Sequence, residues 1–288
     1  MSDYKFINIP GGKRWIISAP KRASRPRLKR KGCVFCPENL LDETDPIVCS
    51  IPEEGKWRVT VKKNKYPFTP YHEVVILTPQ HVKSLADVTI EQVRLGIEMY
   101  IERYNALKKR GTVVIFGNSG NSAGESIGHP HAQIAVVPEN VSVDVPSLEK
   151  NIAYYGEHFK VGDFQVICPP YSQWPDEVFI VPLERGRTFG QATYKEIESL
   201  SYIWQRLLTI FNIRHGGKFP HNFYIYPYKD WYVRIIPRDK ILGGFEMATE
   251  IYVNTGDPAE TMEFIKENFA ETEEKAIRKH KAKYRKGV

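Results

Sequence analysis

Two histidines and a glutamine alternate along one segment near the middle of the chain. His129, His131 and Gln133 belong to HPHAQIAVVP, whose apolar residues predict a β-strand over residues 129–138. Because side chains alternate between the two faces of a strand, these three are expected to point the same way. Imidazole and carboxamide groups placed side by side can bind a metal ion, attack phosphorus or hold phosphate oxygens. Two ordinary half-buried histidines are the alternative.

A loop rich in glycine and serine leads directly into this segment. Residues 117–128 read GNSGNSAGESIG, and the four glycines allow backbone N–H groups to approach an anion closely. Asn118, Ser122 and Ser126 add hydrogen-bond donors. Such loops are often plain turns, but the position just before the histidines favours phosphate binding. Glu125 is expected to face solvent and is given no role.

Cys33 and Cys36 form a C-x-x-C pair of the kind that holds one edge of a zinc ion. No second such pair exists, so histidines must complete a tetrahedral site; two buried thiols in a turn are the alternative. Spacing alone does not choose among the candidate histidines, which are His72, His81, His129 and His131. Residues 1–10 lack the pattern of a secretion signal, which predicts a cytoplasmic protein without disulfides.

The elements that must hold these residues occur twice, in the order strand, helix, strand, strand. Thr89 and Thr193 begin the two helices with capping-box patterns and lie 104 residues apart, as do Glu73 and Glu177. The first copy has strands at 73–78, 113–116 and 129–138 and a helix at 89–110. The second has strands at 177–182, 222–227 and 231–237 and a helix from residue 193. A duplicated unit is predicted, and coincidence of common patterns is the alternative.

Strands joined by short loops around a single helix predict the α+β class, with a mainly antiparallel sheet and helices packed on it. The boundary between two units is expected near residue 145, giving an N-terminal unit at 1–145 and a C-terminal unit at 146–288. Further strands are expected at 13–19 and 57–62. No G-x-G-x-x-G marks a Rossmann domain, and no run of apolar residues is long enough to predict a membrane span.

Basic residues concentrate at both ends of the chain, whose net charge is +7. Residues 1–31 hold ten Lys and Arg against one acidic residue, and residues 275–288 hold seven and none. Basic ends can bind nucleic acid, but the aromatic residues that would stack on bases are missing from 21–31, and Tyr284 alone occurs in the tail. Nucleic acid is therefore an unexpected partner. The tail is interpreted as a solvated helix end and the N-terminal patch as a phosphate site.

Together these motifs resemble the galactose-1-phosphate uridylyltransferase family, a branch of the histidine-triad superfamily. The likeness runs in the family's order over about residues 12–254. Its blocks are GKRWIISAPKRASRP at 12–26, CVFCPEN at 33–39, NKYPF at 64–68, HEVVILTPQH at 72–81, the glycine loop with HPHAQ, and GGFEMATEIYVN at 243–254. The resemblance implies tandem histidine-triad-like units and a homodimer.

The resemblance also implies a role for each matching residue. His131 would be the nucleophile, and Gln133 would hold the transferred phosphoryl group. A structural zinc ion would be bound by Cys33, Cys36, His81 and His129, which leaves His72 as a non-ligand. Nucleotide and phosphate contacts would come from Arg22, Arg25, Asn64, Asn118, Gly124 and Ser126. Hexose-phosphate contacts would come from the neighbouring subunit, through Lys240, Phe245 and Glu246.

The activity implied is uridylyl exchange between UDP-glucose and a hexose 1-phosphate, a ping-pong reaction of galactose metabolism through nucleotidyl-His131. The alternative is a phosphorylase that passes the nucleotidyl group of an ADP-sugar or a dinucleotide to phosphate, as ADP-glucose phosphorylases do. Lys65, which stands where some uridylyltransferases have an acidic residue, keeps that alternative open. Arg234 and Ile236 stand where some members carry the H-x-H of a second metal site, so no second metal ion is expected.

Overall fold

The computed structural model describes residues 4–10, 14–24, 32–40, 46–52, 54–82 and 84–270. Its strands are β1 (Lys5–Asn8), β2 (Trp15–Ser18), β3 (Ile47–Ile51), β4 (Val59–Lys63), β5 (Tyr71–Ile76), β6 (Thr112–Ser119), β7 (His131–Val137), β8 (His158–Val161), β9 (Phe164–Ile167), β10 (Val178–Pro182), β11 (His221–Ile225) and β12 (Val233–Pro237). Its α-helices are α1 (Pro37–Leu40), α2 (Ile90–Leu107), α3 (Tyr194–Arg214), α4 (Gly244–Thr249) and α5 (Pro258–Phe269).

The described strands other than β1 and β2 form a ten-stranded antiparallel sheet in the order β3-β4-β5-β7-β6-β11-β12-β10-β9-β8. Strands β3, β4, β5, β7 and β6 of the first half correspond in position to β8, β9, β10, β12 and β11 of the second, counted inward from the two edges. Strands β6 and β11 meet at the centre of the sheet. The unit β5-α2-β6-β7 is therefore repeated as β10-α3-β11-β12. The predicted α+β class, antiparallel sheet and repeated order are confirmed.

The two long helices begin where the threonine pattern predicts. Thr193 and Glu196 form a complete capping box at α3. At α2, Thr89 accepts a hydrogen bond from the Gln92 backbone, but the Gln92 side chain turns inward and donates to Leu77 O at 2.8 Å. Only half of the predicted box forms there, because the Gln92 side chain donates to the backbone oxygens of Arg58 and Leu77 instead.

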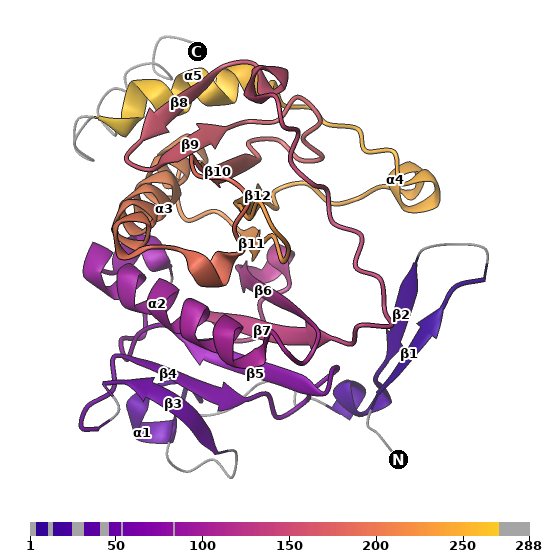
Figure 1. Cartoon of the computed structure of the whole chain (residues 1–288), viewed down its shortest axis with the longest axis vertical. Coiled ribbons are helices and arrows are strands. Elements are labelled where there is room, and N and C mark those ends of the chain that lie inside the picture. The colour runs from indigo at the N-terminus through magenta and orange to yellow at the C-terminus, as the bar shows by residue number, and fades with distance from the viewer. Residues whose placement is uncertain are drawn as a thin grey trace.

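Helices α2 and α3 pack against each other and cover one face of the sheet (Figure 1). The main hydrophobic core lies between them and the strands, with buried residues such as Ile97, Leu207, Ile115, Ile134 and Val233. Burial of each such side chain contributes about 1.5–3 kcal/mol. The opposite face of the sheet stays free of the long helices, and the side chains that alternate with the core residues on β7 point to it.

Close packing also joins the two halves at the centre of the sheet. Gly117 on β6 pairs with Phe223 on β11, and the Phe223 ring lies 2.1 Å from where a Cβ of residue 117 would stand. Only glycine lets the ring sit flat over β6. The ring also packs edge-on against the fully buried Trp204 of α3, with centroids 4.8 Å apart.

In the C-terminal half, the face opposite the helices is covered by the connecting segment, residues 141–156. Tyr155 of this segment is buried in a cluster with Phe179 and Tyr232. Beside that cluster Arg234 pairs with Glu177 at 2.7 Å, and both side chains are buried. In the N-terminal half, Leu40 of α1 packs against Val74 and Ile76 of β5.

The predicted boundary at residue 145 falls inside the connecting segment, between β7 and β8. Both halves contribute to one sheet, and the division into two units stays a prediction. None of the described helices combines the length and the apolar character that a bilayer crossing requires.

Candidate active site

His131 is the first residue of β7, on the sheet face away from the long helices. Its side chain is 9% exposed, and its Nδ1 lies 2.7 Å from the backbone oxygen of His129. A carbonyl oxygen only accepts, so Nδ1 carries the proton. The other ring nitrogen, Nε2, is left with its lone pair. The local backbone thus fixes the imidazole tautomer that can act as a nucleophile.

His129 lies outside the strand that was predicted to contain it, because β7 begins two residues later. The rings of His129 and His131 both lie beside the Phe35 ring, with centroids 6.1 and 5.1 Å from it. Its Nε2 lies 2.8 Å from Thr78 O, which makes Nε2 the protonated nitrogen and leaves the Nδ1 lone pair directed at the Cys33 and Cys36 sulfurs. The backbone carbonyl of His129 therefore contacts His131, while its ring contacts the two cysteines.

Gln133 has a fixed orientation as well. The Phe68 N–H donates to His72 Nδ1, so His72 Nε2 carries a proton and donates to Gln133 Oε1 at 3.0 Å. Asn64 Nδ2 donates to the same oxygen at 3.3 Å, and Asn64 Oδ1 is held by the Tyr66 N–H at 2.9 Å. Both bonds to Oε1 leave the Gln133 amide hydrogens to face the other way. Asn64, which is expected to contact nucleotide, also helps to orient Gln133.

Replacement of Gln133 by alanine is expected to lower kcat by about 10²- to 10³-fold, because one aimed donor to a developing oxyanion is lost. Nucleotide binding should weaken less than kcat falls. The measurement is steady-state kinetics together with a melting curve. Gln80→Ala, at an exposed glutamine, serves as the control. A Gln133 variant that stays folded and works within about threefold of wild type would contradict this role.

The glycine loop brings a carboxylate to the His131 side of the sheet. Gly124 has a left-handed φ of 82°, which only glycine adopts without strain, and it closes the turn between β6 and β7. The expectation that Glu125 faces solvent is wrong. Its carboxylate accepts a hydrogen bond from the Gly120 N–H at 2.9 Å, and burial raises its pKa. Ser126, a predicted phosphate contact, is exposed on the loop.

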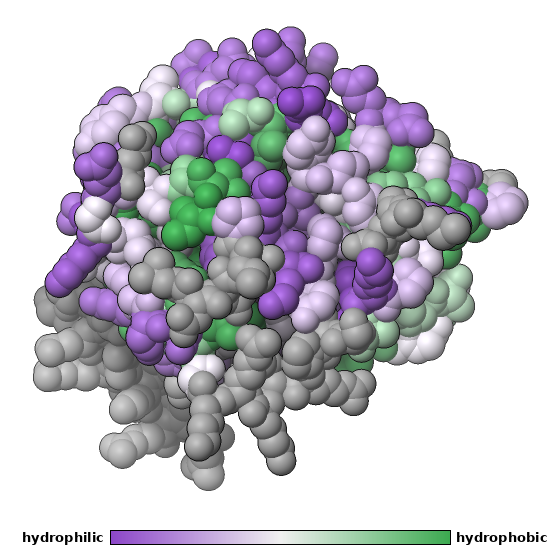
Figure 2. Space-filling view, turned by 90° about the horizontal axis from the view of Figure 1, so that it is seen from below, coloured by the Kyte–Doolittle hydropathy of each residue, from purple (hydrophilic) through white to green (hydrophobic). Residues whose placement is uncertain are grey.

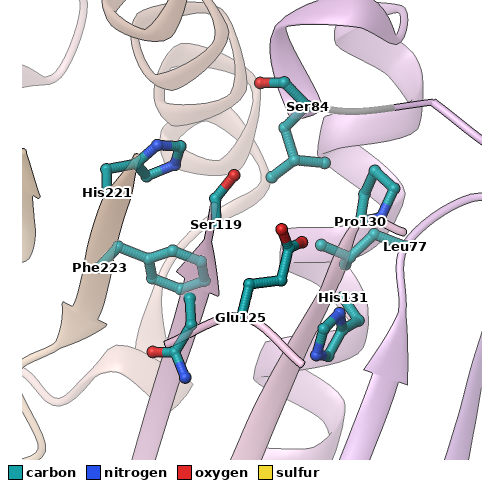
Figure 3. A pocket seen from close by; sticks show the side chains of 10 residues that line it. Leu77, Ser84, Ser119, Glu125, Pro130, His131, His221 and Phe223 are labelled. Atoms are coloured by element: carbon teal, nitrogen blue, oxygen red, sulfur yellow. The ribbon is translucent and has the colours of Figure 1, made fainter. Parts of the chain in front are cut away.

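A small pocket opens beside His131 at the end of the sheet (Figure 3). Glu125 projects into it between His131 on one side and His221 of β11 on the other. Asn118 and Ser119 of β6 also line it. Residues from both halves of the chain therefore surround His131. The sequence pattern gives no sign of His221, because β6–β11 pairing alone places it there.

The unfolding free energy is expected to fall as pH drops from about 6.5 towards 4, partly because of His221. Burial lowers the pKa of its ring from 6.5 to about 4. In that window the unfolded ring binds a proton and the folded ring does not, so acid favours unfolding by up to about 3 kcal/mol. Urea denaturation of wild type and His221→Gln at pH 7 and pH 5 measures the difference. His158→Gln, at a half-exposed histidine, is the control. Equal acid sensitivity of wild type and His221→Gln would refute this account.

Four side chains gather at one end of β7 in an arrangement that could hold a metal ion. They are Cys33, Cys36, His81 and His129, and their ligand atoms all lie within 4.8 Å of one another. Among the described residues, no other group of His, Cys, Asp or Glu side chains is arranged in this way. Neighbouring atoms are 3.4 Å apart for Cys36 and His81, and 3.6 Å apart for Cys33 and His129. Without a cation, burial and the Cys33 thiol raise the pKa of Cys36 to about 11. The ligands predicted from the resemblance are thus brought together, and His72 is elsewhere, as predicted.

Of the predicted phosphate contacts at the N-terminus, Arg22 can be placed. It donates to Tyr66 O, and its guanidinium lies 4.9 Å from the centre of the Phe68 ring. Arg22 therefore reaches the segment that orients Gln133. Arg25 lies outside the described residues.

The predicted hexose-phosphate residues lie together at α4, well apart from β7 (Figure 1). Lys240 Nζ pairs with Glu246 Oε1 at 3.1 Å, and Glu246 also accepts from the Gly243 N–H at 3.1 Å. Phe245 is 55% exposed. One chain therefore does not bring these residues to its own His131.

Residues 64–138 match the family model of the galactose-1-phosphate uridyl transferase N-terminal domain. The resemblance to the galactose-1-phosphate uridylyltransferase family is confirmed. The matched segment includes His131 and Gln133, whereas Cys33 and Lys240 lie outside it. An ADP-glucose phosphorylase from Arabidopsis thaliana is 24% identical over 323 residues, covering 90% of this chain and 91% of the relative. A galactose-1-phosphate uridylyltransferase from Thermotoga maritima is 22% identical over 305 residues, covering 89% and 96%.

Solved structures related to this family share the fold. The crystal structure of an Arabidopsis thaliana ADP-glucose phosphorylase with bound ADP-glucose has a TM-score of 0.72 at 22% identity, covering 92% of this chain and 99% of that one. A uridylyltransferase structure has a TM-score of 0.71 at 21% identity, covering 92% and 98%. These likenesses confirm the predicted fold.

Proposed function

We propose that this protein is a nucleotidyltransferase that uses His131 as its nucleophile. The observation that carries the proposal is the imidazole tautomer: Nδ1–H is held by His129 O at 2.7 Å, and the ring lines a pocket beside the glycine loop. Nε2 would attack the α-phosphorus of a nucleotide sugar. The N–P bond forms as the bond from phosphorus to the bridging oxygen breaks, and sugar 1-phosphate leaves. An oxygen of the acceptor phosphate then attacks phosphorus, and the N–P bond breaks.

The surrounding groups match the charges of this reaction. The proton stays on His131 Nδ1 throughout, and the His129 carbonyl stabilises the positive charge that the ring gains when Nε2 bonds to phosphorus. Gln133 would donate to a phosphoryl oxygen, and Asn118 and the loop amides would hold the remaining oxygens. Arg22 would add charge-assisted bonds to phosphate from the N-terminal side.

The donor and acceptor define two forms of this activity. The first is uridylyl exchange between UDP-glucose and a hexose 1-phosphate. The second passes the nucleotidyl group of an ADP-sugar or a dinucleotide to phosphate, and it is supported by the similarity to an ADP-glucose phosphorylase over 90% of the chain. Both forms use the same His131 chemistry and differ in the donor and the acceptor.

The metal ion at the Cys33, Cys36, His81 and His129 cluster is proposed to be zinc, in a structural role. Zinc–sulfur distances of about 2.3 Å and zinc–nitrogen distances of about 2.0 Å place tetrahedral ligand atoms roughly 3.3–3.8 Å apart. The distances of 3.4 and 3.6 Å between neighbouring ligand atoms fit that geometry. Four protein ligands fill the coordination shell, so the ion would fix the entry to β7 and leave the chemistry to His131.

A homodimer in the cytoplasm is the proposed setting. Residues Phe245 and Met247 of α4 are 55% and 68% exposed, and Ile7 and Ile16 of the β1–β2 hairpin are 48% and 51% exposed. Hydrophobic residues are visible in Figure 2 at the right-hand edge, the side on which α4 and the hairpin lie in Figure 1. A second subunit would bury these residues, and α4 of each subunit would then lie beside the His131 site of the other. Free thiols at the metal cluster suit a reducing compartment.

The test is to incubate the protein with ADP-glucose or UDP-glucose carrying ³²P at the α-phosphate. We expect an acid-labile, alkali-stable protein label that disappears when the correct acceptor is added. Release by hexose 1-phosphate identifies uridylyl exchange, and release by inorganic phosphate identifies the phosphorylase. Absence of label from both donors, and from a labelled dinucleotide, would overturn the proposal.

A further inference from the structure

Asn222 of the C-terminal half contacts the glycine loop of the N-terminal half. In the β6–β11 register it is the partner of Asn118. Phe116 pairs with Gln133 across β6 and β7, and Asn118 follows Phe116 by two residues. Asn118 therefore lies on the same sheet face as Gln133. Asn222 Nδ2 lies 2.8 Å from Asn118 Oδ1 and 2.8 Å from Ala123 O in the loop.

Arg238, directly after β12, fixes which way the Asn222 amide faces. Arg238 Nη1 lies 2.8 Å from Asn222 Oδ1. A guanidinium only donates and the Ala123 carbonyl only accepts, so both contacts require the Asn222 oxygen towards Arg238 and its NH₂ towards the loop. That NH₂ in turn requires an acceptor from Asn118, which must present Oδ1. The Asn118 amide hydrogens are thereby turned away from Asn222.

Arg238 has no carboxylate partner within the described residues. Its guanidinium lies 4.3 Å from the centre of the Trp174 ring, and burial lowers its pKa. Asn222 is the acceptor it reaches with a side-chain hydrogen bond. A structural ion pair would use an acidic residue, as Arg234 uses Glu177. The charge of Arg238 is instead directed at an amide that contacts the glycine loop.

We propose that Arg238 and Asn222 are positioning residues that set Asn118 to donate its NH₂ to a phosphate group of the nucleotide; this inference rests on the proposed function. Asn118 lines the same pocket as His131, and its NH₂ has no acceptor within the described parts of the chain. A reversed Asn118 amide would present oxygen to an anion and repel it. The C-terminal half therefore sets the donor geometry of the site in the N-terminal half.

The experiment is a double-mutant cycle of Arg238→Met and Asn118→Ala in the full-length chain. Calorimetry measures the Kd for ADP and UDP, and rapid quenching measures the rate of His131 labelling. Arg238→Met is expected to weaken binding of the preferred nucleotide about tenfold. In the Asn118→Ala background the same change should cost less than about twofold, since its target is gone. Arg58→Met, at a half-exposed arginine paired with Glu91, is the control.

Asn222→Asp supplies a second variant in case Arg238→Met unfolds. The aspartate still offers an oxygen to Arg238, but the NH₂ group that donates to Asn118 is replaced by a second oxygen. The Asn118 amide should therefore turn its NH₂ towards residue 222, and nucleotide affinity should fall as much as in Asn118→Ala. Equal losses from Arg238→Met in both backgrounds, or a loss no larger than that of Arg58→Met, would overturn the inference. If the wild-type protein binds nucleotide but forms no covalent label, the proposed function alone is wrong. The Kd values of the double-mutant cycle still test whether Arg238 and Asn222 orient Asn118. Wild type that binds neither nucleotide would overturn both.

Discussion

His131→Ala is expected to abolish the covalent label and to lower turnover by about 10⁵-fold or more, as loss of a nucleophile does in other enzymes. His221 lines the same pocket and has its Nδ1 beside Phe219 O at 3.2 Å, but His131 is the histidine that lies on β7 two residues from Gln133. Nucleotide binding should survive, because Gln133 and Arg22 keep their own supports. Labelling, turnover and calorimetric Kd are measured on the same preparation.

The control for this variant is His158→Ala, which removes a histidine from β8. It should label and turn over like wild type. If His131→Ala retained turnover within about a hundredfold of wild type while staying folded, attack would have to come from the acceptor itself, without a protein nucleophile. A label that remained but moved to another residue would instead identify a different protein nucleophile.

Cys36→Ser is expected to lose the bound metal ion and to lower the melting temperature by about 10 °C. A structural zinc ion contributes its binding free energy to folding, and about 4 kcal/mol corresponds to a shift of that size in a domain this large. Activity should fall as well, because the metal ion would hold the His129 ring, and the His129 carbonyl oxygen lies 2.7 Å from His131 Nδ1. Elemental analysis, thermal melting and labelling rate are the measurements.

Cys49→Ala is the matched control, since Cys49 touches Met99 and lies outside the metal cluster. It should keep near one zinc ion per chain. The assignment would be refuted by a Cys36→Ser protein with unchanged metal content. It would equally be refuted by wild type that is purified without metal and melts at the same temperature after dialysis against a chelator.

The sequence alone predicted the features that depend on neighbouring residues. The spacing of His131 and Gln133, the cap at Thr193 and the repeated order of elements are local patterns, and all three appear in the structure. Strands β1, β3, β8 and β9 were not predicted, because each is short and is stabilised by pairing with a neighbour rather than by its own alternation. Sheet edges of this kind are poorly marked in sequence.

The parts of the site that escaped prediction depend on contacts between distant segments. His221 and Asn222 reach the glycine loop because β11 pairs with β6 about a hundred residues away. The direction of the Gln133 amide is set by His72, through a tautomer that depends on the Phe68 N–H. Glu125 was expected in solvent because charged residues usually are; its hydrogen bond to Gly120 is what holds it in the pocket.

The C-terminal half has Arg234, paired with buried Glu177, where some family members carry a histidine of a second metal site. This buried pair makes a return to histidine at that position costly. Changing Arg234 to histidine would leave the Glu177 charge uncompensated in a dry environment, a cost of several kcal/mol, before any ligand could be bound. Removing both charges would still leave Tyr155 and its neighbours filling the space. A second centre at the position of Arg234 would therefore require several simultaneous changes, each damaging when made singly.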